Sequence, residues 1–444
     1  MLSSVRQAVL LSGGSLAAAA LASEAAGLAF DARDMSASVK GHTTNFDGDV
    51  NGLFTYTSPS TKYVRNSAGL LVPGTTMRCD HDASGNKLGL LIEEQRTNLL
   101  TRSSEIDNAA WTKSGAAITA DQIAAPDGNT AADLFTENTA SSAHAVYNGF
   151  SATSGTTYTV SVFVKAGTQR YICLRGEDTD ATAGQAWPWI TLDTQTGTIA
   201  ANGSVTSSSV TAYANGWYRI SLTFVSGVTG TNNLVIAGGS SSAAPATNIS
   251  LGPSYLGTSQ TFYVWGAQAE AGAFPTSYIP TAGSTVTRAA DNISLATSAF
   301  PFNAAAWSVD AWASDAAVGS DRTIWIMHAT ASMSTRRATA FRTTSGVARV
   351  YLDGSADAGG TATLSNATVD ATAFKQATAY AVNDAAAVTN GGSPATDADI
   401  VLPAFDTLRL GNYNASSIFL NGHLRSFRFV PRRRPNAELQ AVTA

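Results

Sequence analysis

Alternating apolar and polar residues dominate the middle of this 444-residue chain. The segment TYTVSVFVKAG (157–167) places Tyr158, Val160, Val162 and Val164 on one face of an extended chain, with mainly Thr and Ser opposite. GWYRISLTFVSG and TFYVWGAQAEAG repeat this two-residue period, and the intervening DTQTG and YANG are typical turn sequences. Such a pattern predicts an antiparallel β-sandwich over 105–292.

A second series of strand-like segments follows over 293–444. The expected strands are WSVDAWASD, RTIWIMHA, ARVYLDG, DTLRLGN and HLRSFRFVPR. NAAW at 108–111 and NAAAW at 303–307 precede the alternation in each half, which is a weak sign of duplication. The stretch FPTSYIPTAGSTVTRAADN, rich in Pro, Thr and Gly, is a natural linker. The chain is therefore expected to be all-β, with two tandem jelly-roll or lectin-like sandwiches.

Two further segments precede the sandwiches. Residues 30–104 contain short strands and turns, including the hairpin signal KYVRNSAGLLV, and predict a small β-rich anchoring module. Residues 1–29 are rich in Ala, and at first sight they look like a secretory signal. Gly13 and Gly14 interrupt the apolar stretch, which is too broken to cross a bilayer, where about 20 continuous apolar residues are needed. We expect a retained helical segment that attaches the chain to sister chains or to a larger assembly.

Composition narrows the possible partners. Only 13% of the residues are charged, against about 25% in typical proteins, and the net charge is −5. A nucleic-acid binder needs a basic face, and the only dense basic run is Arg432, Arg433 and Arg434, which is more typical of a solvated terminus. The two cysteines, Cys79 and Cys173, are far apart and predict separate, partly buried thiols in a reducing cytosol.

The segment GLLIEEQRTNLL (89–100) concentrates charge between leucines and allows two interpretations, an acid/base pair or a joint between domains. Neighbouring side chains diverge on both strands and helices, so Glu93 and Glu94 cannot converge on one glycosidic bond, which needs carboxyl groups about 5–9.5 Å apart. Arg96 can pair with either glutamate while the leucines are buried. We predict that Glu93, Glu94 and Arg96 form a domain joint.

The best ligand candidates are Trp187 and Trp189 in GQAWPWITLD. Residues two apart share one face of a strand, and paired indoles can stack on the CH groups of a sugar ring. The alternative, in which both rings pack in the core of the first sandwich, is at least as favourable. Four other tryptophans lie within strand alternation and are expected in the cores: Trp217, Trp265, Trp307 and Trp325.

Metal and cofactor signals are weak. RGEDTDATAG gathers Glu177, Asp178 and Asp180, whose oxygens could hold calcium, but the spacing lacks the EF-hand pattern and favours a solvated acidic loop. The five histidines are scattered without metal-ligand spacing. No phosphate-binding loop or nucleophile elbow is present in the sequence. We expect no metal site, no cofactor and no catalytic residue.

Several segments together resemble bacteriophage virion fibre or spike proteins of the head-fibre or tail-fibre type. The most specific is GLLIEEQRTNLLTRSSEIDNAAWTK (89–113). FTYTSPSTKYVRNSAGLL and MRCDHDASGNKLG are similar to the small N-terminal module of those proteins, and GWYRISLTF and FYVWGAQAEAGAFPTSYIPTAGSTVTRAADN to their first sandwich and its exit. GHLRSFRFVPRRRPNAELQAVT is similar to the closing segment of laminin-G or concanavalin-like sandwiches. The chain departs from the pattern at Cys79 and in its Ala-rich N-terminus.

The resemblance implies a structural component of a phage particle, a fibre or spike that is assembled in the bacterial cytoplasm. The N-terminal region would contact capsid or tail proteins, the chain would form a homotrimer, and the sandwiches would bind host surface glycans during adsorption. Nucleic acid and membrane insertion are not expected, and the family supplies no catalytic residues. Two alternatives remain, namely a virion-attached polysaccharide-degrading enzyme and a purely architectural decoration protein.

Overall fold

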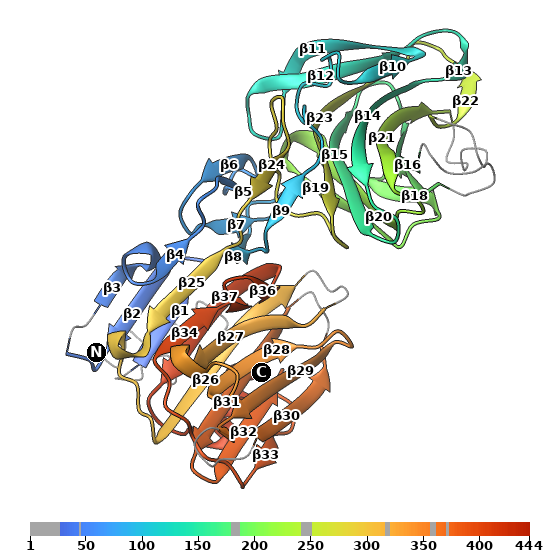
Figure 1. Ribbon diagram of the computed structural model, residues 1–444. Coiled ribbons are helices and arrows are strands. Elements are labelled where there is room, and N and C mark those ends of the chain that lie inside the picture. Colours follow the sequence, from blue (N-terminus) through green and yellow to red (C-terminus); the bar gives the residue numbers. More distant parts are fainter. Residues whose placement is uncertain are drawn as a thin grey trace.

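The computed structural model describes residues 27–43, 46–178, 187–240, 251–315, 320–355, 361–369 and 373–444. In these ranges the chain is built almost entirely of antiparallel strands, which confirms the predicted all-β class. The only α-helix among the described residues is α3 (Asn436–Thr443). Figure 1 shows two lobes joined by a narrow waist, with the first sandwich in one lobe and both ends of the described chain in the other.

The first lobe is a sandwich of two six-stranded sheets. The strand order of sheet 1 is β10 (Thr112–Ser114), β14 (Ala145–Ala152), β21 (Gly230–Gly239), β16 (Tyr171–Asp178), β17 (Trp189–Asp193) and β18 (Thr198–Gly203). The order of sheet 2 is β11 (Ala116–Ala124), β12 (Thr130–Glu137), β23 (Thr261–Ala271), β15 (Thr157–Ala166), β20 (Trp217–Val225) and β19 (Ser207–Ala212). β13 (Ser141–Ala143) pairs with β22 (Ser254–Leu256). Alternate apolar residues of both sheets, such as Val160, Val162, Leu174 and Ile236, meet in the core because successive side chains point to opposite faces.

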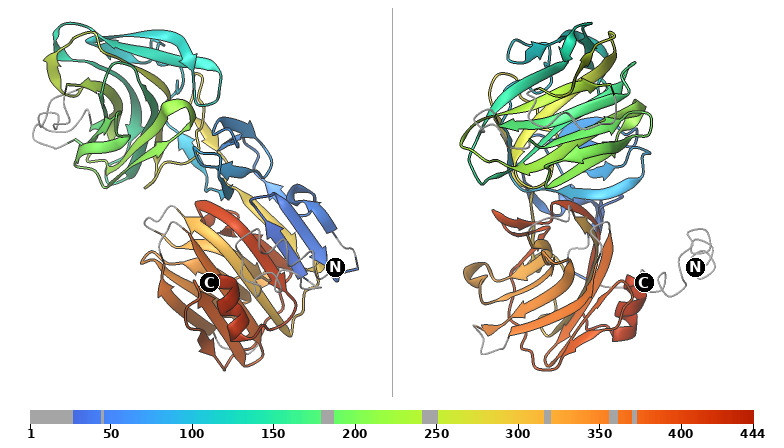
Figure 2. Two further views of the ribbon diagram at one scale, coloured as in Figure 1. Left: turned by 180° about the vertical axis from the view of Figure 1, so that it is seen from behind. Right: turned by 90° about the vertical axis from the view of Figure 1, so that its right-hand side faces the viewer.

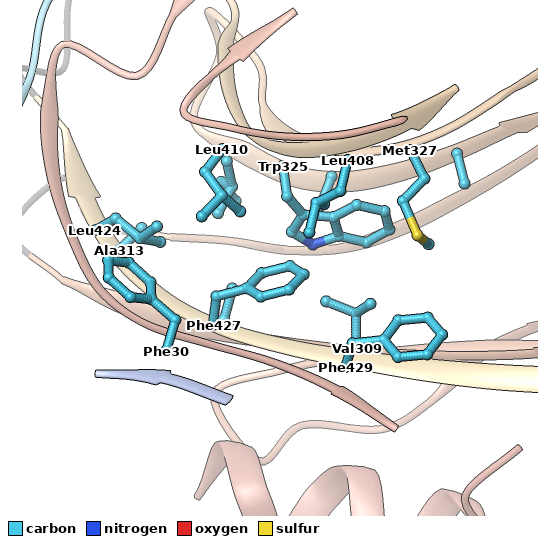
Figure 3. Close-up of a cluster of buried hydrophobic side chains, with 14 of the residues drawn as sticks. Phe30, Val309, Ala313, Trp325, Met327, Leu408, Leu410, Leu424, Phe427 and Phe429 are labelled. Carbon is cyan, nitrogen blue, oxygen red and sulfur yellow. The ribbon is translucent and has the colours of Figure 1, made fainter. Parts of the chain in front are cut away.

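The second lobe joins a ten-stranded sheet to a seven-stranded sheet. Sheet 3 follows the order β3 (Phe46–Asp49), β2 (Ser36–Lys40), β1 (Gly27–Asp31), β37 (Gly422–Val430), β26 (Ala306–Asp315), β31 (Phe374–Ala381), β32 (Asp384–Thr389) and β33 (Ala395–Asp397). Two further strands extend this sheet: β8 (Lys87–Ile92) pairs with β37, and β7 (Cys79–His81) pairs with β8. Sheet 4 follows the order β30 (Thr361–Thr368), β29 (Val347–Asp353), β28 (Arg337–Arg342), β27 (Arg322–His328), β34 (Thr407–Leu410), β25 (Asn292–Ala296) and β4 (Thr55–Thr57). In Figure 3, Trp325 and Met327 of sheet 4 face Phe427, Phe429 and Val309 of sheet 3.

Three short ladders complete the fold. β5 (Lys62–Arg65) and β6 (Leu71–Gly74) form a hairpin beside the waist, and β9 (Arg96–Asn98) pairs with β24 (Val286–Arg288) within it. β35 (Asn412–Asn414) and β36 (Ser417–Phe419) form a hairpin in the second lobe. The β9–β24 ladder brings the segment that enters the first sandwich beside the segment that leaves it.

The small module predicted over 30–104 is not a separate unit. Phe30 on β1 lies opposite Phe427 on β37, and Tyr56 on β4 lies opposite Ile293 on β25, so the early strands extend both sheets of the second sandwich. Leu28 and Phe30 are buried in the same core as the C-terminal strands. Short strands reveal their apolar faces in the sequence but not the partner strand, which here lies almost 400 residues further along the chain. Residues 1–26 of the predicted helical attachment segment lie outside the described residues.

The predicted solvated run Arg432–Arg434 is also corrected by the structure. The Arg434 side chain is completely buried and donates to Asp310 at 2.5 Å. Arg433 pairs with Asp384 at 2.7 Å, and Arg432 pairs with Glu438 of α3 at 2.9 Å. In Figure 2, α3 packs on the outside of the second lobe, where its Leu439 is buried against Ala and Val side chains of β31 and β32. Each arginine thus anchors the chain end to sheet 3 or to α3.

Both cysteines are free thiols, as predicted. Cys173 is buried in sheet 1, and burial raises the pKa of its thiol to about 12. Among the described residues, no helix has the length and apolar character required to cross a bilayer.

Candidate functional site

A groove of about 420 Å³ lies on the outer face of sheet 4. Ala338, Ala340, Val350 and Leu352 point into the core from β28 and β29, so the residues between them point outward. The groove is lined by Asp321, Thr323, Arg337, Thr339, Phe341, Tyr351, Tyr413 and Ile418.

The β35–β36 hairpin contributes one wall of the groove through Tyr413 and Ile418. Ile418 has a backbone φ of 52° and is 40% exposed. A β-branched residue in this left-handed region costs about 1–3 kcal/mol, and such strain is concentrated at binding surfaces. The hairpin therefore presents an aliphatic side chain to solvent in a conformation that an unconstrained loop would avoid.

Arg337 lies between two tyrosine rings in the lining of the groove. Its guanidinium carbon is 5.0 Å from the ring centre of Tyr351 and 5.4 Å from that of Tyr413. It also donates a hydrogen bond to the Tyr413 hydroxyl and lies 3.8 Å from the Asp353 carboxylate. Cation–π contacts of this kind are worth about 0.5–2 kcal/mol each, so they hold the three side chains in a defined arrangement.

Asp353 anchors this arrangement from below. Its carboxylate accepts hydrogen bonds from the Tyr351 hydroxyl at 3.2 Å and from the Ser355 hydroxyl at 2.7 Å. Burial acts to raise its pKa, but the hydrogen bonds from Ser355 and Tyr351 and the charge of Arg337 outweigh burial, so the pKa of Asp353 lies below its ordinary value. The carboxylate is therefore ionised at neutral pH and keeps its partners in place.

The groove combines flat aromatic faces with polar groups. Tyrosine rings can stack on the CH face of a sugar, and the Arg337 guanidinium can donate to hydroxyl or carboxylate oxygens. Asp321 already accepts hydrogen bonds from the backbone N–H (3.0 Å) and hydroxyl (3.2 Å) of Thr344. It is the only carboxylate among the described lining residues, whereas glycoside hydrolysis normally requires two that converge. The chemistry of these residues favours binding.

The predicted ligand residues Trp187 and Trp189 lie elsewhere, on the outer face of sheet 1. The Trp189 ring packs against a small buried cluster that includes Cys173 and Val235. The guanidinium of Arg175 lies 5.2 Å from the ring centre of Trp187. Both tryptophans are partly exposed, while Ile190 and Leu192 of the same strand face the core, so the alternative of core packing is wrong. Their contact with a glycan stays a prediction.

The other predicted tryptophans and the acidic loop have separate outcomes. Trp217, Trp265, Trp307 and Trp325 are buried, as predicted. The possible calcium ligands Glu177, Asp178 and Asp180 lie outside the residues whose side chains the structure describes. In the described part of the chain, no three His, Cys, Asp or Glu side chains gather in a way that could hold a metal ion.

Glu93 and Glu94 lie at the waist and bind different partners. The Glu93 carboxylate accepts hydrogen bonds from the backbone N–H (2.7 Å) and hydroxyl (2.6 Å) of Ser277, on the segment that leaves the first sandwich. The Glu94 carboxylate accepts from the Asn421 amide at 2.9 Å, directly before β37 of the second sandwich, and pairs with Arg96. The two glutamates therefore do not face each other as an acid/base pair.

A buried ionic cluster surrounds Glu93. Arg288 lies 3.7 Å from the Glu93 carboxylate, and Lys62 pairs with Asp291 at 2.5 Å. Burial acts to raise the pKa of Glu93, but the charges of Arg288 and Lys62 and the Ser277 hydrogen bonds lower it overall. These four charged residues come from β5, the β8–β9 connection, β24 and the β24–β25 connection, so the cluster joins four separate segments at the waist.

The groove residues were missed at the level of sequence, although a signal was present. In ARVYLDG, Val350 and Leu352 alternate with Arg349 and Tyr351. If the first pair faces the core, the second pair must face outward on the same strand. An exposed Tyr and Arg on one face of a strand is a binding signal, but Tyr413 reaches the same place only through the fold.

Comparisons with known proteins found distant likenesses among solved structures only. No known family model matches the sequence, and no curated protein matches it. Among solved structures, the Ruminococcus gnavus sialidase CBM40 bound to α2,3 sialyllactose is 13% identical, with 32% of this chain and 84% of that chain covered and a TM-score of 0.28. Mouse laminin α1 domains LG4-5 are 9% identical, with 78% of this chain and 91% of that chain covered and a TM-score of 0.23. Trypanosoma rangeli sialidase in complex with the inhibitor DANA is 10% identical, with 74% of this chain and 62% of that chain covered and a TM-score of 0.26. Likenesses at these scores do not identify a ligand or an activity for this chain.

Proposed function

We propose that this protein is an adhesive structural protein that binds glycans through the groove on sheet 4. The observation that carries the proposal is the Arg337 guanidinium held between the rings of Tyr351 and Tyr413 on an accessible sheet face. Asp353 fixes this arrangement before any ligand arrives, so binding costs little ordering of side chains.

We further propose that the protein belongs to a bacteriophage particle as a fibre or spike. The support is the resemblance of residues 89–113 and the segments around them to head-fibre and tail-fibre chains. In this proposal the N-terminal region attaches to capsid or tail proteins and three sister chains assemble together. Three linked grooves would then raise the avidity for a repetitive host surface by about 10²–10⁴ over one weak contact.

A glycan array tests the binding proposal with the full chain. We expect Tyr351→Ala and Arg337→Ala to lower binding of the recognised glycans by about tenfold or more, the loss typical of a central binding residue. Val382→Ala, at an exposed apolar position on the β31–β32 turn, is the control and should leave binding unchanged. Wild-type binding that survives both groove substitutions would contradict the assignment of the groove.

Three further measurements separate the alternatives. Trp187→Ala and Trp189→Ala on the same array show whether the outer face of sheet 1 also contacts glycan. Incubation with host capsule followed by size analysis distinguishes binding from degradation, and shortened glycans would contradict a purely adhesive role. Imaging of labelled particles tests the placement on the virion, and an array without any bound glycan would favour an architectural role.

A further inference from the structure

A second polar surface lies on the opposite sheet of the same sandwich, around Trp312 of β26. Val309 and Ala311 of this strand face the core, and the partly exposed Trp312 ring lies on the outer face of sheet 3. Three cations surround the ring. The guanidinium carbons of Arg425 and Arg33 lie 4.7 and 5.3 Å from its centre, and the Lys375 ammonium lies 5.6 Å from it. We call these four side chains the Trp312 cluster.

The fold assembles the cluster from four segments. Lys375 on β31 lies directly opposite Trp312 in the strand register, and Arg425 comes from β37 on the other side of β26. Arg33 comes from the turn between β1 and β2, where Asp31 holds its guanidinium at 2.9 Å. The backbone N–H of Ala32 donates to the Arg425 carbonyl at 3.0 Å, which fixes this turn against β37. The positions of the cations are therefore set by sheet pairing.

Arg425 differs from the other arginines on this face. Arg428 and Arg434 pair with Asp310, and Arg433 pairs with Asp384. Within the described part of the chain, the Arg425 side chain contacts the Trp312 ring and has no carboxylate partner, and its buried Nε has no hydrogen-bond acceptor. Burial lowers the pKa of Arg425, and the positive charge of nearby Arg33 lowers it further. An external anion would supply the missing acceptor and reduce this repulsion.

We propose that the Trp312 cluster binds the carboxylate or sulfate groups of an acidic polysaccharide. A single anion gains little binding free energy from partly exposed cations, whereas a polymer with closely spaced charges makes several such contacts at once. A nucleic acid would also be a polyanion, but its bases stack on free aromatic faces, and the Trp312 ring already has three cations over it. This site is independent of the groove on sheet 4, which lies on the other sheet of the sandwich.

Affinity measurements with the full chain test the proposal. The ligands are heparin as a sulfated polymer, polygalacturonate as a carboxylated polymer, dextran as a neutral polymer and single-stranded DNA. We expect binding to at least one acidic polysaccharide, weakened by salt, and a loss of about tenfold in Arg425→Gln because a charge-assisted hydrogen bond is removed. Arg78→Gln removes one charge from an exposed arginine outside the cluster and should leave the affinity unchanged.

Several outcomes would overturn the proposal. The first is that neither acidic polysaccharide binds, and the second is that Arg425→Gln binds them with the affinity of the wild type. The third is that single-stranded DNA binds as tightly as the acidic polysaccharides. The fourth is that inorganic phosphate, at the same concentration of charge, displaces the bound polymer. Thermal unfolding of each variant shows whether the sandwich is intact, and Trp312→Phe, which retains an aromatic ring, provides a second test if Arg425→Gln is unstable. Tyr351→Ala should leave acidic-polymer binding intact, so failure of this proposal and failure of the groove are distinguishable.

Discussion

At the scale of single residues, buried charges concentrate where the two sandwiches meet. Asp291 accepts hydrogen bonds from the Lys62 ammonium (2.5 Å), the Tyr56 hydroxyl (2.6 Å) and the Glu93 backbone N–H (2.8 Å). Lys62 and Asp291 are both buried. A buried ion pair of this kind contributes little compared with an apolar packing, but the loss of one partner leaves an uncompensated charge.

Asp291→Ala should therefore be strongly destabilising. We expect the free energy of unfolding to fall by about 3–5 kcal/mol, because Lys62 would remain buried without its closest carboxylate. Chemical denaturation measures the loss. Asp384→Ala is the matched control, since its pair with Arg433 is partly exposed and should change stability by about 1 kcal/mol or less. Equal effects of the two substitutions would contradict this role of the cluster.

Asp80 should make the stability of the protein depend on acid. It accepts hydrogen bonds from His423 (2.9 Å) and the Arg65 backbone N–H (2.7 Å). Burial acts to raise its pKa, but the hydrogen bond and charge of His423 and the charge of Arg65 lower it well below the ordinary value of 3.8. The ionised carboxylate is thus favoured by folding, and its contribution is present above the unfolded pKa and lost as the pH falls through the lower folded pKa.

Asp80→Asn tests this linkage. At pH 7 we expect the free energy of unfolding to fall by about 1–3 kcal/mol, because charge-assisted hydrogen bonds are lost. The difference between variant and wild type should shrink as the pH is lowered below about 4, where the wild-type carboxyl group becomes protonated in the unfolded chain. Denaturant titrations of both proteins at several pH values measure this difference in the free energy of unfolding. A difference that stays constant from pH 7 to pH 3 would argue against the assigned pKa shift.

At the scale of elements, the two faces of one sheet have different tasks. The inner face of sheet 4 carries Trp325 and Met327 into the core, and its outer face carries the groove. On sheet 3, α3 covers the outer face over β31 and β32, while the Trp312 cluster lies on the same face further along β26. Each strand thus combines core positions with surface positions at a period of two residues.

The attachment of α3 depends on one apolar anchor. Leu439 is fully buried against Ala377, Ala379, Ala386 and Val388. Leu439→Ala should cost about 2–5 kcal/mol of local stability and release the helix, because the helix of eight residues is too short to persist in water alone. Hydrogen exchange of the α3 amides measures the release. Ala437→Ser, at an exposed helix position, is the control, and unchanged protection in Leu439→Ala would contradict this anchoring role.

At the scale of the whole molecule, the second sandwich contains both ends of the described chain. β1 and β4 pair with β37 and β25, and the first sandwich is inserted between these partners in sequence. The contacts that close the second sandwich therefore join residues hundreds of positions apart, whereas the first sandwich is closed by strands from 112–271. The two sandwiches should respond differently to truncation.

Removal of residues 1–57 should unfold the second sandwich and spare the first. The deletion takes away four strands and the core residues Leu28, Phe30 and Val39. Limited proteolysis should then yield a resistant fragment that contains the first sandwich, while the full chain resists cleavage in both lobes. A truncated chain with an intact second sandwich would show that the early strands form a dispensable module.

The sequence predicts the secondary structure elements better than it predicts the candidate site. The strand alternation of 157–167 and the buried tryptophans follow from local pattern, and the structure agrees with them. The local pattern does not reveal which strand pairs with which. All extended segments offer the same backbone N–H and C=O groups, so any two of them could form the same hydrogen bonds. For this reason the sequence predicts a separate module for the early strands and does not connect Tyr413 with Tyr351.

The sequence alone determined that this chain folds as antiparallel sheets, because a period of two residues leaves one apolar face that must be buried. It also determined that Glu93 and Glu94 diverge, since adjacent side chains cannot point the same way. Tertiary structure alone decided where the groove and the Trp312 cluster form. Arg337 meets its two tyrosines, and Trp312 meets its three cations, only because sheet pairing places distant strands side by side. The free energy of that pairing comes from burial over the whole core, which no short segment contains.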